Sequence, residues 1–194
     1  SLDLETLLRN AENAMRNAKR HGRNIVRCYD DSMFEITERR MTLEVELRKA
    51  LPDKQFMLHY QPRICAATKH IVGAEALLRW QHPTLGSISP VEFIPVLEEM
   101  GLIHEVGAWV MEGACRQLKQ WHNSGHRAFV MSVNLSAVQF RDIRLAQEIG
   151  AVIARTDIAP EYLEFELTET AIMEDVAQTQ KSLALLKEIG VKLA

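Results

Sequence analysis

The sequence predicts an α/β fold, a partial TIM-like (β/α) barrel that follows a short helical region. Two observations lead to this prediction. After Pro52, strand patterns alternate with longer helical patterns, which is typical of a parallel sheet with helices packed outside it. The chain has 194 residues, whereas a complete eight-unit barrel needs about 250. Because residues 191–194 have the pattern of a strand that is just beginning, we expect only the first part of a barrel.

The region before Pro52 is predicted to hold two helices and one strand. Apolar residues recur at helical spacing over residues 2–20, and Gly22 is well placed to end this helix. Residues 25–29, Ile-Val-Arg-Cys-Tyr, have the composition of a strand. A second helix is predicted over residues 32–50, because apolar residues again recur along one side and Pro52 prevents its continuation.

After Pro52 the predicted elements alternate between the two types. The strands are short and apolar, and the helices between them carry an apolar stripe that would face the sheet. The predicted strands cover residues 56–61, 70–80, 128–134 and 162–167. The predicted helices cover residues 90–100, 103–121, 143–156 and 175–189.

Composition and charge narrow the class of protein. The net charge of −3 and the pI near 6.2 predict no general polyanion surface and hence no DNA or RNA partner. No apolar run approaches the roughly 18 residues of a membrane span, and the start of the chain lacks a signal-peptide pattern. The widely spaced cysteines, Cys28, Cys65 and Cys115, favour reduced thiols in a cytoplasmic domain. A larger parent protein could still be anchored to a membrane by another region.

Polar residues that apolar packing does not explain stand on three of the predicted strands. Glu75 lies on the second strand, Asn134 ends the third and Glu166 ends the fourth. The carboxyl ends of parallel strands meet at one edge, where functional side chains gather. Oxygen donors without His or Cys suit Mg²⁺ or Mn²⁺ rather than Zn²⁺. With Arg79 close by in the sequence, the set predicts a site for a phosphorylated ligand.

The sequence around these residues resembles the EAL domain family from about Leu51 to Ala194. Residues 75–80, Glu-Ala-Leu-Leu-Arg-Trp, look like the signature that gives the family its name. Neighbouring motifs occur in the family's order and at similar spacing, which makes the resemblance specific. These motifs are Tyr60-Gln61-Pro62, Ser89-Pro90-Val91-Glu92-Phe93-Ile94-Pro95, Val133-Asn134-Leu135-Ser136 and Glu166-Leu167-Thr168-Glu169.

The resemblance implies an activity and a set of site residues. EAL domains are phosphodiesterases that use Mg²⁺ or Mn²⁺ to hydrolyse cyclic di-GMP to the linear dinucleotide pGpG. By resemblance, Glu75, Asn134 and Glu166 would be metal ligands. Gln61, Leu77 and Arg79 would contact the cyclic di-GMP, with Arg79 at a phosphate. Glu169 would act one layer further out and hold a neighbouring loop in place.

The resemblance also predicts the organisation of the chain. Residues 1–31 resemble the last helix and strand of a GGDEF domain, without the loop that names that domain, so no cyclase activity is expected of them. Residues 32–51 would form a helical linker, and residues 52–194 would form the N-terminal part of an EAL domain. An unpaired sheet edge would favour a homodimer through the EAL domain.

Two further expectations follow from the family pattern. Its catalytic lysine and paired aspartates would lie after Ala194, so the 194 residues alone are predicted to have little or no hydrolase activity. The alternative to an enzyme is a degenerate EAL domain that serves as a non-catalytic cyclic di-GMP receptor or protein-interaction module. The sequence also departs from the family pattern at Arg63, which follows the Tyr-Gln-Pro element and is not a proposed metal ligand.

Overall fold

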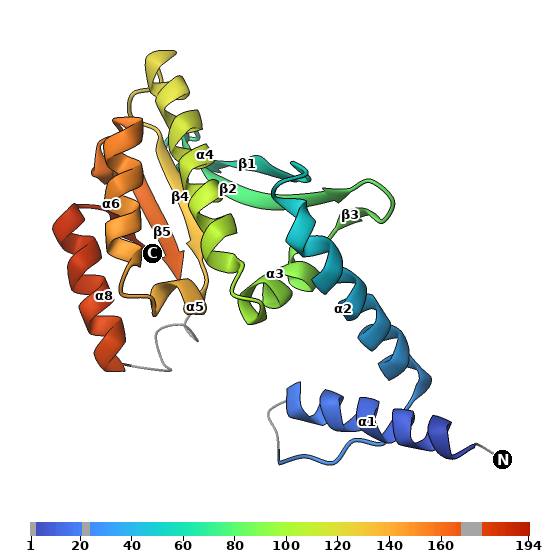
Figure 1. Ribbon diagram of the computed structural model, residues 1–194. Coiled ribbons are helices and arrows are strands. Elements are labelled where there is room, and N and C mark those ends of the chain that lie inside the picture. Colours follow the sequence, from blue (N-terminus) through green and yellow to red (C-terminus); the bar gives the residue numbers. More distant parts are fainter. Residues whose placement is uncertain (1–2, 21–23, 168–175) are drawn as a thin grey trace. The chain divides into compact units, whose positions relative to one another are not determined.

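Residues 3–20, 24–167 and 176–194 are described by the computed structural model shown in Figure 1. The chain divides into two units, Ser1–Lys49 and Ala50–Ala194. The first unit is helical, and the second holds a sheet with its helices. No helix within the described ranges combines the length and the apolar character that crossing a membrane requires.

The first unit contains helix α1 (Leu4–Arg20) and most of helix α2 (Asp31–Ala50), as the sequence predicts. Asp3 caps α1, because its Oδ1 atom accepts a hydrogen bond from the Thr6 backbone N–H at 2.7 Å. Hydrogen bonds from Thr6 lower the pKa of Asp3 below its usual value. The guanidinium of Arg9 lies over the ring of Phe34, 5.3 Å from its centroid, and joins the two helices of this unit.

The strand predicted over residues 25–29 is wrong. Residues 25–30 form neither helix nor strand, and Val26 is 94 % exposed. A strand needs neighbours that pair with its backbone, and an apolar composition alone does not supply them. Within the described part of the first unit there is no other strand to pair with. The helix of the predicted helix–strand remnant is therefore present, and its strand is not.

The second unit is built on a six-stranded sheet with the order β1-β2-β4-β5-β6, and β3 pairs with β2 outside this path. The neighbours β2–β4, β4–β5 and β5–β6 are parallel, which confirms the strand–helix alternation read from the sequence. The strands are β1 (Phe56–Ile64), β2 (Ile71–His82), β3 (Gly86–Ile88), β4 (Val130–Leu135), β5 (Leu163–Leu167) and β6 (Lys192–Leu193).

Two strands depart from the predicted parallel sheet, β1 by its direction and β3 because no strand was predicted there. Both β1 and β3 pair with β2 in antiparallel fashion. Only residues 65–70 separate β1 from β2, and a parallel connection needs a dozen or more residues. The sheet is therefore mixed rather than wholly parallel. Its closure into part of a barrel stays a prediction.

Helices separate the parallel strands and pack on one another and on the sheet (Figure 1). Helix α4 contacts β1, β2 and β4 as well as α6, and α6 contacts α8. The sequence predicts four of these helices to within a few residues, but not the short α5 and η1. The helices of this unit are α3 (Pro90–Glu99), α4 (Ile103–Asn123), α5 (Ala137–Phe140), α6 (Leu145–Thr156), the 3-10 helix η1 (Pro160–Tyr162) and α8 (Val176–Ile189).

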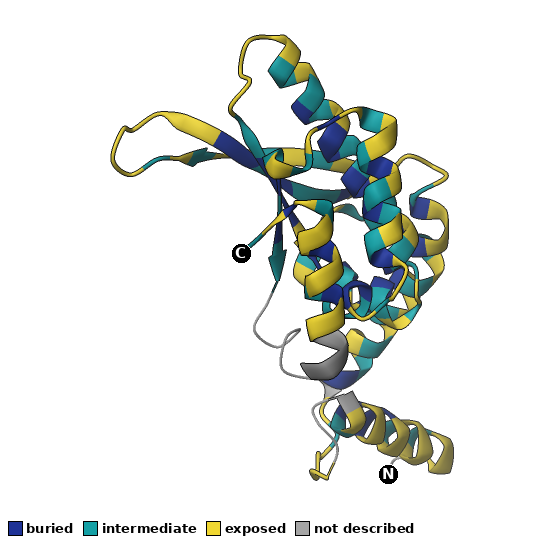
Figure 2. Cartoon of the chain, turned by 90° about the vertical axis from the view of Figure 1, so that its left-hand side faces the viewer, coloured by how far each residue is buried: buried dark blue, intermediate teal, exposed yellow. Residues whose placement is uncertain are grey.

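The two faces of the sheet differ in polarity because successive strand residues point to opposite sides. One face is apolar and buried, and buried residues gather where sheet and helices meet (Figure 2). The other face carries the polar residues of the predicted site and is for the most part half-buried or exposed. The buried face includes Ala74, Ala76 and Trp80 of β2, Met131, Val133 and Leu135 of β4, and Leu163 and Phe165 of β5.

An aromatic cluster anchors β2 to β1 and α3. The Trp80 ring centroid lies 6.0 Å from that of Phe56 and 5.6 Å from that of Phe93. Trp80 and Phe93 are fully buried, and each contributes about 2–3 kcal/mol through its removal from water. The indole N–H of Trp80 donates to Gln55 Oε1 at 2.9 Å, so the buried polar atom is satisfied. This cluster fixes the strand that carries Glu75.

The three cysteines are free thiols. Cys115 is buried in α4, and burial raises the pKa of its thiol to about 11. Hydrogen bonds from Thr68 lower the pKa of Cys65, which lies in the turn between β1 and β2. The two thiols therefore differ in their tendency to form a reactive thiolate.

Candidate functional site

The three predicted metal ligands come together on the polar face of the sheet. Glu75 on β2 and Asn134 on β4 are in contact, because Asn134 Nδ2 donates to Glu75 Oε1 at 2.7 Å. Asn134 and Glu166 are register partners on the adjacent strands β4 and β5. The parallel register therefore brings together three residues, of which Glu75 and Glu166 are 91 positions apart in the sequence (166 − 75).

The hydrogen bond between Glu75 and Asn134 determines which oxygen atoms remain available. The amide nitrogen of Asn134 is committed to Glu75, which leaves its Oδ1 atom free to accept or to bind a cation. The Glu166 carboxylate has no hydrogen bond or ion pair to any residue that the structure describes. The set consequently offers two carboxylates and one amide oxygen on one half-exposed surface.

The predicted ligand-contacting residues lie on the same face of β1 and β2. Gln61 is exposed and is the register partner of Glu75. Leu77 and Arg79 follow Glu75 by two and four residues on β2, so their side chains leave the strand on its side. Arg79 donates to the Leu78 carbonyl at 2.9 Å and forms no ion pair with a carboxylate of the described residues. Its charge is therefore available to an anion.

Glu169 lies outside the described residues, so its predicted role in holding a loop stays a prediction. Within the described ranges, no three His, Cys, Asp or Glu side chains gather into a metal cluster. The candidate site differs from such a cluster because one of its three donors is the amide oxygen of Asn134. Carboxylate and amide oxygens fit a hard cation such as Mg²⁺ or Mn²⁺.

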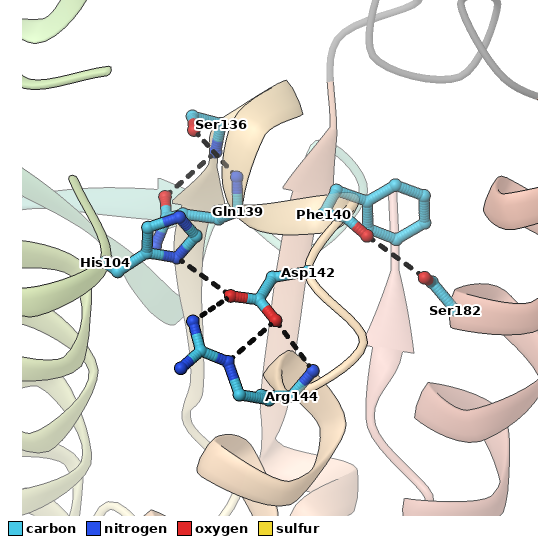
Figure 3. Close-up of polar contacts among 7 residues, drawn as sticks. All are labelled: His104, Ser136, Gln139, Phe140, Asp142, Arg144 and Ser182. Carbon is cyan, nitrogen blue, oxygen red and sulfur yellow. Dashed lines mark hydrogen bonds and ion pairs between the residues drawn. The ribbon is translucent and has the colours of Figure 1, made fainter. Parts of the chain in front are cut away.

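The segment after Asn134 is held in place by a helix cap. Ser136 is the N-cap of α5, and its Oγ atom accepts a hydrogen bond from the Gln139 backbone N–H at 3.2 Å. In return, Gln139 Oε1 accepts from the Ser136 backbone N–H at 3.1 Å (Figure 3). This reciprocal capping box fixes the chain two residues beyond Asn134. Sequence reasoning missed it, although Ser-x-x-Gln is its sequence signature.

Contacts with two longer helices hold the capped segment from outside. Gln139 is buried and lies so close to α4 that a Cβ atom on Gly107 would stand 2.0 Å from its Nε2 atom. On the other side, the buried Ser182 of α8 donates to the Phe140 carbonyl at 3.0 Å (Figure 3). The position of Asn134 thus depends on α4 and α8 as well as on its own strand.

A charged cluster follows α5 in the same segment (Figure 3). Arg144 donates to both carboxylate oxygens of Asp142, from Nε at 3.1 Å and from Nη2 at 2.7 Å. His104 of α4 lies with its Nδ1 atom 3.5 Å from Asp142 Oδ2. Hydrogen bonds from the Arg144 side chain and backbone lower the pKa of Asp142 to about 2. Asp142 is therefore ionised at neutral pH and links the segment to α4.

A second group of polar residues lies next to the donors on the same face of the sheet. It was not recognised as part of a site from the sequence. Arg63 forms an ion pair with Glu164, and Ser132 donates to the same carboxylate at 3.1 Å. No motif marks these residues as a group, and their contact follows from the strand order and register of the sheet.

Oxygen donors close to an arginine on a sheet of mainly parallel strands are typical of proteins that bind phosphorylated ligands. The chain belongs to the EAL domain family, because the model of that family matches residues 44–194. This finding confirms the resemblance seen in the sequence.

Curated relatives and solved structures agree with this assignment. The chain is 38 % identical to the bifunctional diguanylate cyclase/cyclic di-GMP phosphodiesterase MucR of Pseudomonas aeruginosa over 97 % of its own length and 27 % of MucR. It is 36 % identical to the cyclic di-GMP phosphodiesterase NbdA of the same species, over 98 % of this chain and 24 % of NbdA. The chain thus spans about a quarter of the length of these relatives.

Among solved structures, the PaMucR phosphodiesterase in a c-di-GMP complex matches with a TM-score of 0.76 and 39 % identity, over 78 % of this chain and 62 % of that chain. The FimX EAL domain of Xanthomonas citri in complex with c-di-GMP matches with a TM-score of 0.69 and 27 % identity, over 81 % of this chain and 60 % of that chain. The mixed α/β fold of the second unit is therefore that of EAL domains.

Two helical glycines provide a test of the contact between α4 and the segment after Asn134. Gly107→Ala is expected to lower the free energy of unfolding by about 1–2 kcal/mol, because the new methyl group displaces the buried Gln139 side chain. Gly150→Ala in α6 is the matched control and should raise it by about 0.5–1 kcal/mol, since its Cβ meets no atom within 4 Å. Urea denaturation measures both. Equal stabilisation by the two substitutions would contradict the close packing at Gly107.

The Asp142 cluster predicts a pH dependence of stability. The pKa of Asp142 is lowered in the folded state, so its contribution is present above its usual value of 3.8 and is lost as the pH falls through about 2. Asp142→Asn should lower the free energy of unfolding at pH 7 by about 1 kcal/mol, a modest value because Arg144 is largely exposed.

The difference between this variant and the wild type should shrink between pH 4 and pH 2, as followed by urea denaturation at several pH values. Asp53→Asn serves as control, because Asp53 is exposed and its side chain forms no ion pair or hydrogen bond with the residues that the structure describes. A difference that grows as the pH falls would show that the pKa of Asp142 is not lowered.

Proposed function

We propose that this EAL domain is a metal-dependent phosphodiesterase that hydrolyses cyclic di-GMP to linear pGpG. The observation that carries the proposal is the set of Glu75, Asn134 and Glu166, joined by a hydrogen bond and by strand register on one face of the sheet. Relatives named as cyclic di-GMP phosphodiesterases, which cover almost the whole chain at 36–38 % identity, support it.

The donor set is proposed to bind Mg²⁺ or Mn²⁺. Glu75 and Glu166 supply two negative charges, which balance one divalent cation, and the Asn134 amide adds a neutral oxygen. Hydrogen bonding to Asn134 limits the rotation of the Glu75 carboxylate, so one donor positions another. When bound, such a metal would activate water and offset charge on the phosphodiester.

The remaining residues of the face are proposed to bind the nucleotide. Arg79 would hold a phosphate, because its guanidinium has no carboxylate partner among the described residues. Exposed Gln61 next to Glu75 offers both a donor and an acceptor to the ligand. Leu77 lies between Glu75 and Arg79 on the same face and would supply an apolar contact.

The organisation of the longer protein is also a proposal. Residues 1–31 are assigned to the end of a GGDEF domain, 32–51 to a linker and 52–194 to the EAL domain. The match to MucR, a protein named as both cyclase and phosphodiesterase, covers 97 % of the chain and so includes the region before the EAL match, which supports this division. Homodimer formation through the EAL domain is also proposed, because an unpaired sheet edge can pair with a second copy of the chain.

Substitution of Glu75 tests the proposed chemistry in the full-length protein. Glu75→Ala should reduce Mg²⁺- or Mn²⁺-dependent pGpG formation to below about 1 % of the wild-type rate, because it removes a metal ligand and the partner of Asn134. Chromatographic measurement of pGpG gives the rate. Glu188→Ala on α8 removes an exposed carboxylate far along the sequence and should leave the rate unchanged.

Three possible outcomes of these experiments lead to different conclusions. Unchanged turnover in Glu75→Ala would remove Glu75 from the site. A wild-type protein that binds cyclic di-GMP without hydrolysing it would support the receptor alternative. Turnover that survives complete removal of divalent metals by EDTA would contradict the metal requirement.

The 194 residues alone are proposed to bind the nucleotide without efficient turnover. They supply Glu75, Asn134 and Glu166, whereas the catalytic lysine and paired aspartates that the family pattern implies would lie beyond Ala194. We expect pGpG production by the purified 194-residue chain to stay near background at saturating Mn²⁺. Rapid metal-dependent production would overturn this expectation while leaving the site assignment intact.

A further inference from the structure

The polar face of the sheet carries more polar residues than the proposed site uses. Strand residues two positions apart share a face and are separated by about 7 Å along the strand. Two residues along the strand from each of four proposed site residues, which we call the upper level, stands a member of a second group, the lower level. These levels follow each strand separately, and in the register of β2 with β4 the lower-level Ser132 is the partner of Glu75. The upper level is Gln61, Glu75, Asn134 and Glu166, and the lower level is Arg63, Gly73, Ser132 and Glu164.

The lower level is joined by one network of hydrogen bonds. Arg63 Nη1 donates to both Ser132 Oγ and Glu164 Oε1. Ser132 Oγ in turn donates to Glu164 Oε1 at 3.1 Å. Ser132 is fully buried, and the Glu164 side chain is 16 % exposed. One arginine therefore ties β1 to β4 and β5, the strands that carry Gln61, Asn134 and Glu166.

Gly73 makes this long contact possible. It is the register partner of Arg63, and its strand, β2, lies between β1 and β4. Because Gly73 has no side chain, the Arg63 side chain can cross over β2 and reach the two strands beyond it. A larger residue cannot take the place of Gly73, since a Cβ atom there would stand 2.1 Å from the Val130 carbonyl oxygen. The absence of a side chain at Gly73 is therefore what allows Arg63 to contact β4 and β5.

The network also changes the net charge of the polar face, because it neutralises Glu164. Glu164 is the third carboxylate on this face, two residues from Glu166 on the same strand. Left unpaired, it would repel the upper carboxylates and offer a competing place for a cation. Arg63 pairs with it, so only Glu75 and Glu166 keep a net negative charge for a divalent ion.

We propose that Arg63 is a positioning residue of the metal site, which acts through Ser132 and Glu164 across the gap at Gly73. It fixes the spacing of β1, β4 and β5 next to the three donors and keeps Glu164 out of cation binding. The inference rests on the proposed metal-binding function, and it adds a residue that touches neither the cation nor the nucleotide. A residue of this kind typically changes metal affinity by about 10–100-fold.

The direction in which cation affinity changes on removal of Arg63 distinguishes a positioning role from a purely electrostatic one. Loss of a positive charge near a cation site by itself favours cation binding. Loss of a positioning contact weakens it. The matched control is therefore Arg79→Gln, which removes the same charge from the same face without breaking an ion pair among the described residues.

The test is a titration of the full 194-residue chain with Mn²⁺ alone, followed by electron paramagnetic resonance of the free ion. Arg63→Gln should weaken Mn²⁺ binding about tenfold, whereas Arg79→Gln should leave it unchanged or tighter. Arg63→Lys, which keeps the charge at the end of a long side chain, should restore affinity to within about threefold of the wild type. Circular dichroism and thermal unfolding establish the folded fraction of each variant.

Ser132→Ala provides a second variant that changes no charge and removes one hydroxyl from the network. It should weaken Mn²⁺ binding about threefold, and it decides the matter if Arg63→Gln does not fold. Unchanged or tighter binding in the folded Arg63→Gln or, failing that, in Ser132→Ala would overturn the inference. If the wild type and Glu75→Gln bind Mn²⁺ equally, the proposed metal site fails and the role of Arg63 fails with it. If only Glu75→Gln is weakened, the site stands and the role of Arg63 alone is refuted.

Discussion

The close approach of β2 and β4 at Gly73 is the constraint on which the geometry of the site depends. No side chain fits between the two backbones there, because a Cβ atom would lie 2.1 Å from the Val130 carbonyl oxygen. This contact belongs to the register that places Glu75 next to β4, where Asn134 reaches it with a hydrogen bond of 2.7 Å. A shift of one residue would turn every side chain of β2 to the opposite face. Glu75 would then point into the apolar core, away from Asn134 and Glu166.

The apolar face supplies the stability that the polar face does not. Trp80, Phe93 and Phe165 are fully buried under the helices, whereas the polar face holds carboxylates close to one another. Grouping like charges costs free energy unless a counter-charge or a bound cation compensates. The sheet tolerates this arrangement because its opposite face is well packed and because Arg63 neutralises one of the carboxylates. Stability and chemistry are thus divided between the two faces of the same strands.

Local patterns predicted the parts of this structure that depend on local sequence. The parallel strands, the main helices and the convergence of Glu75, Asn134 and Glu166 follow from periodicity and strand ends. The antiparallel direction of β1 depends on the short connection of residues 65–70, which periodicity does not take into account. The strand expected at residues 25–29 failed because pairing requires a neighbour that composition does not reveal.

The contacts hardest to predict join residues that no motif links. Arg63 and Glu164 are 101 positions apart, and their pairing depends on strand order, on register and on the absence of a side chain at Gly73. From the sequence, Arg63 is only a departure from a family pattern. Placed in the sheet, its charge cancels that of Glu164, so that a divalent cation would balance Glu75 and Glu166 and leave the positive charges of Arg79 and of Lys192, the register partner of Glu164, on this face. An anionic phosphodiester would then approach a surface of net positive charge, which is the electrostatic condition for binding it.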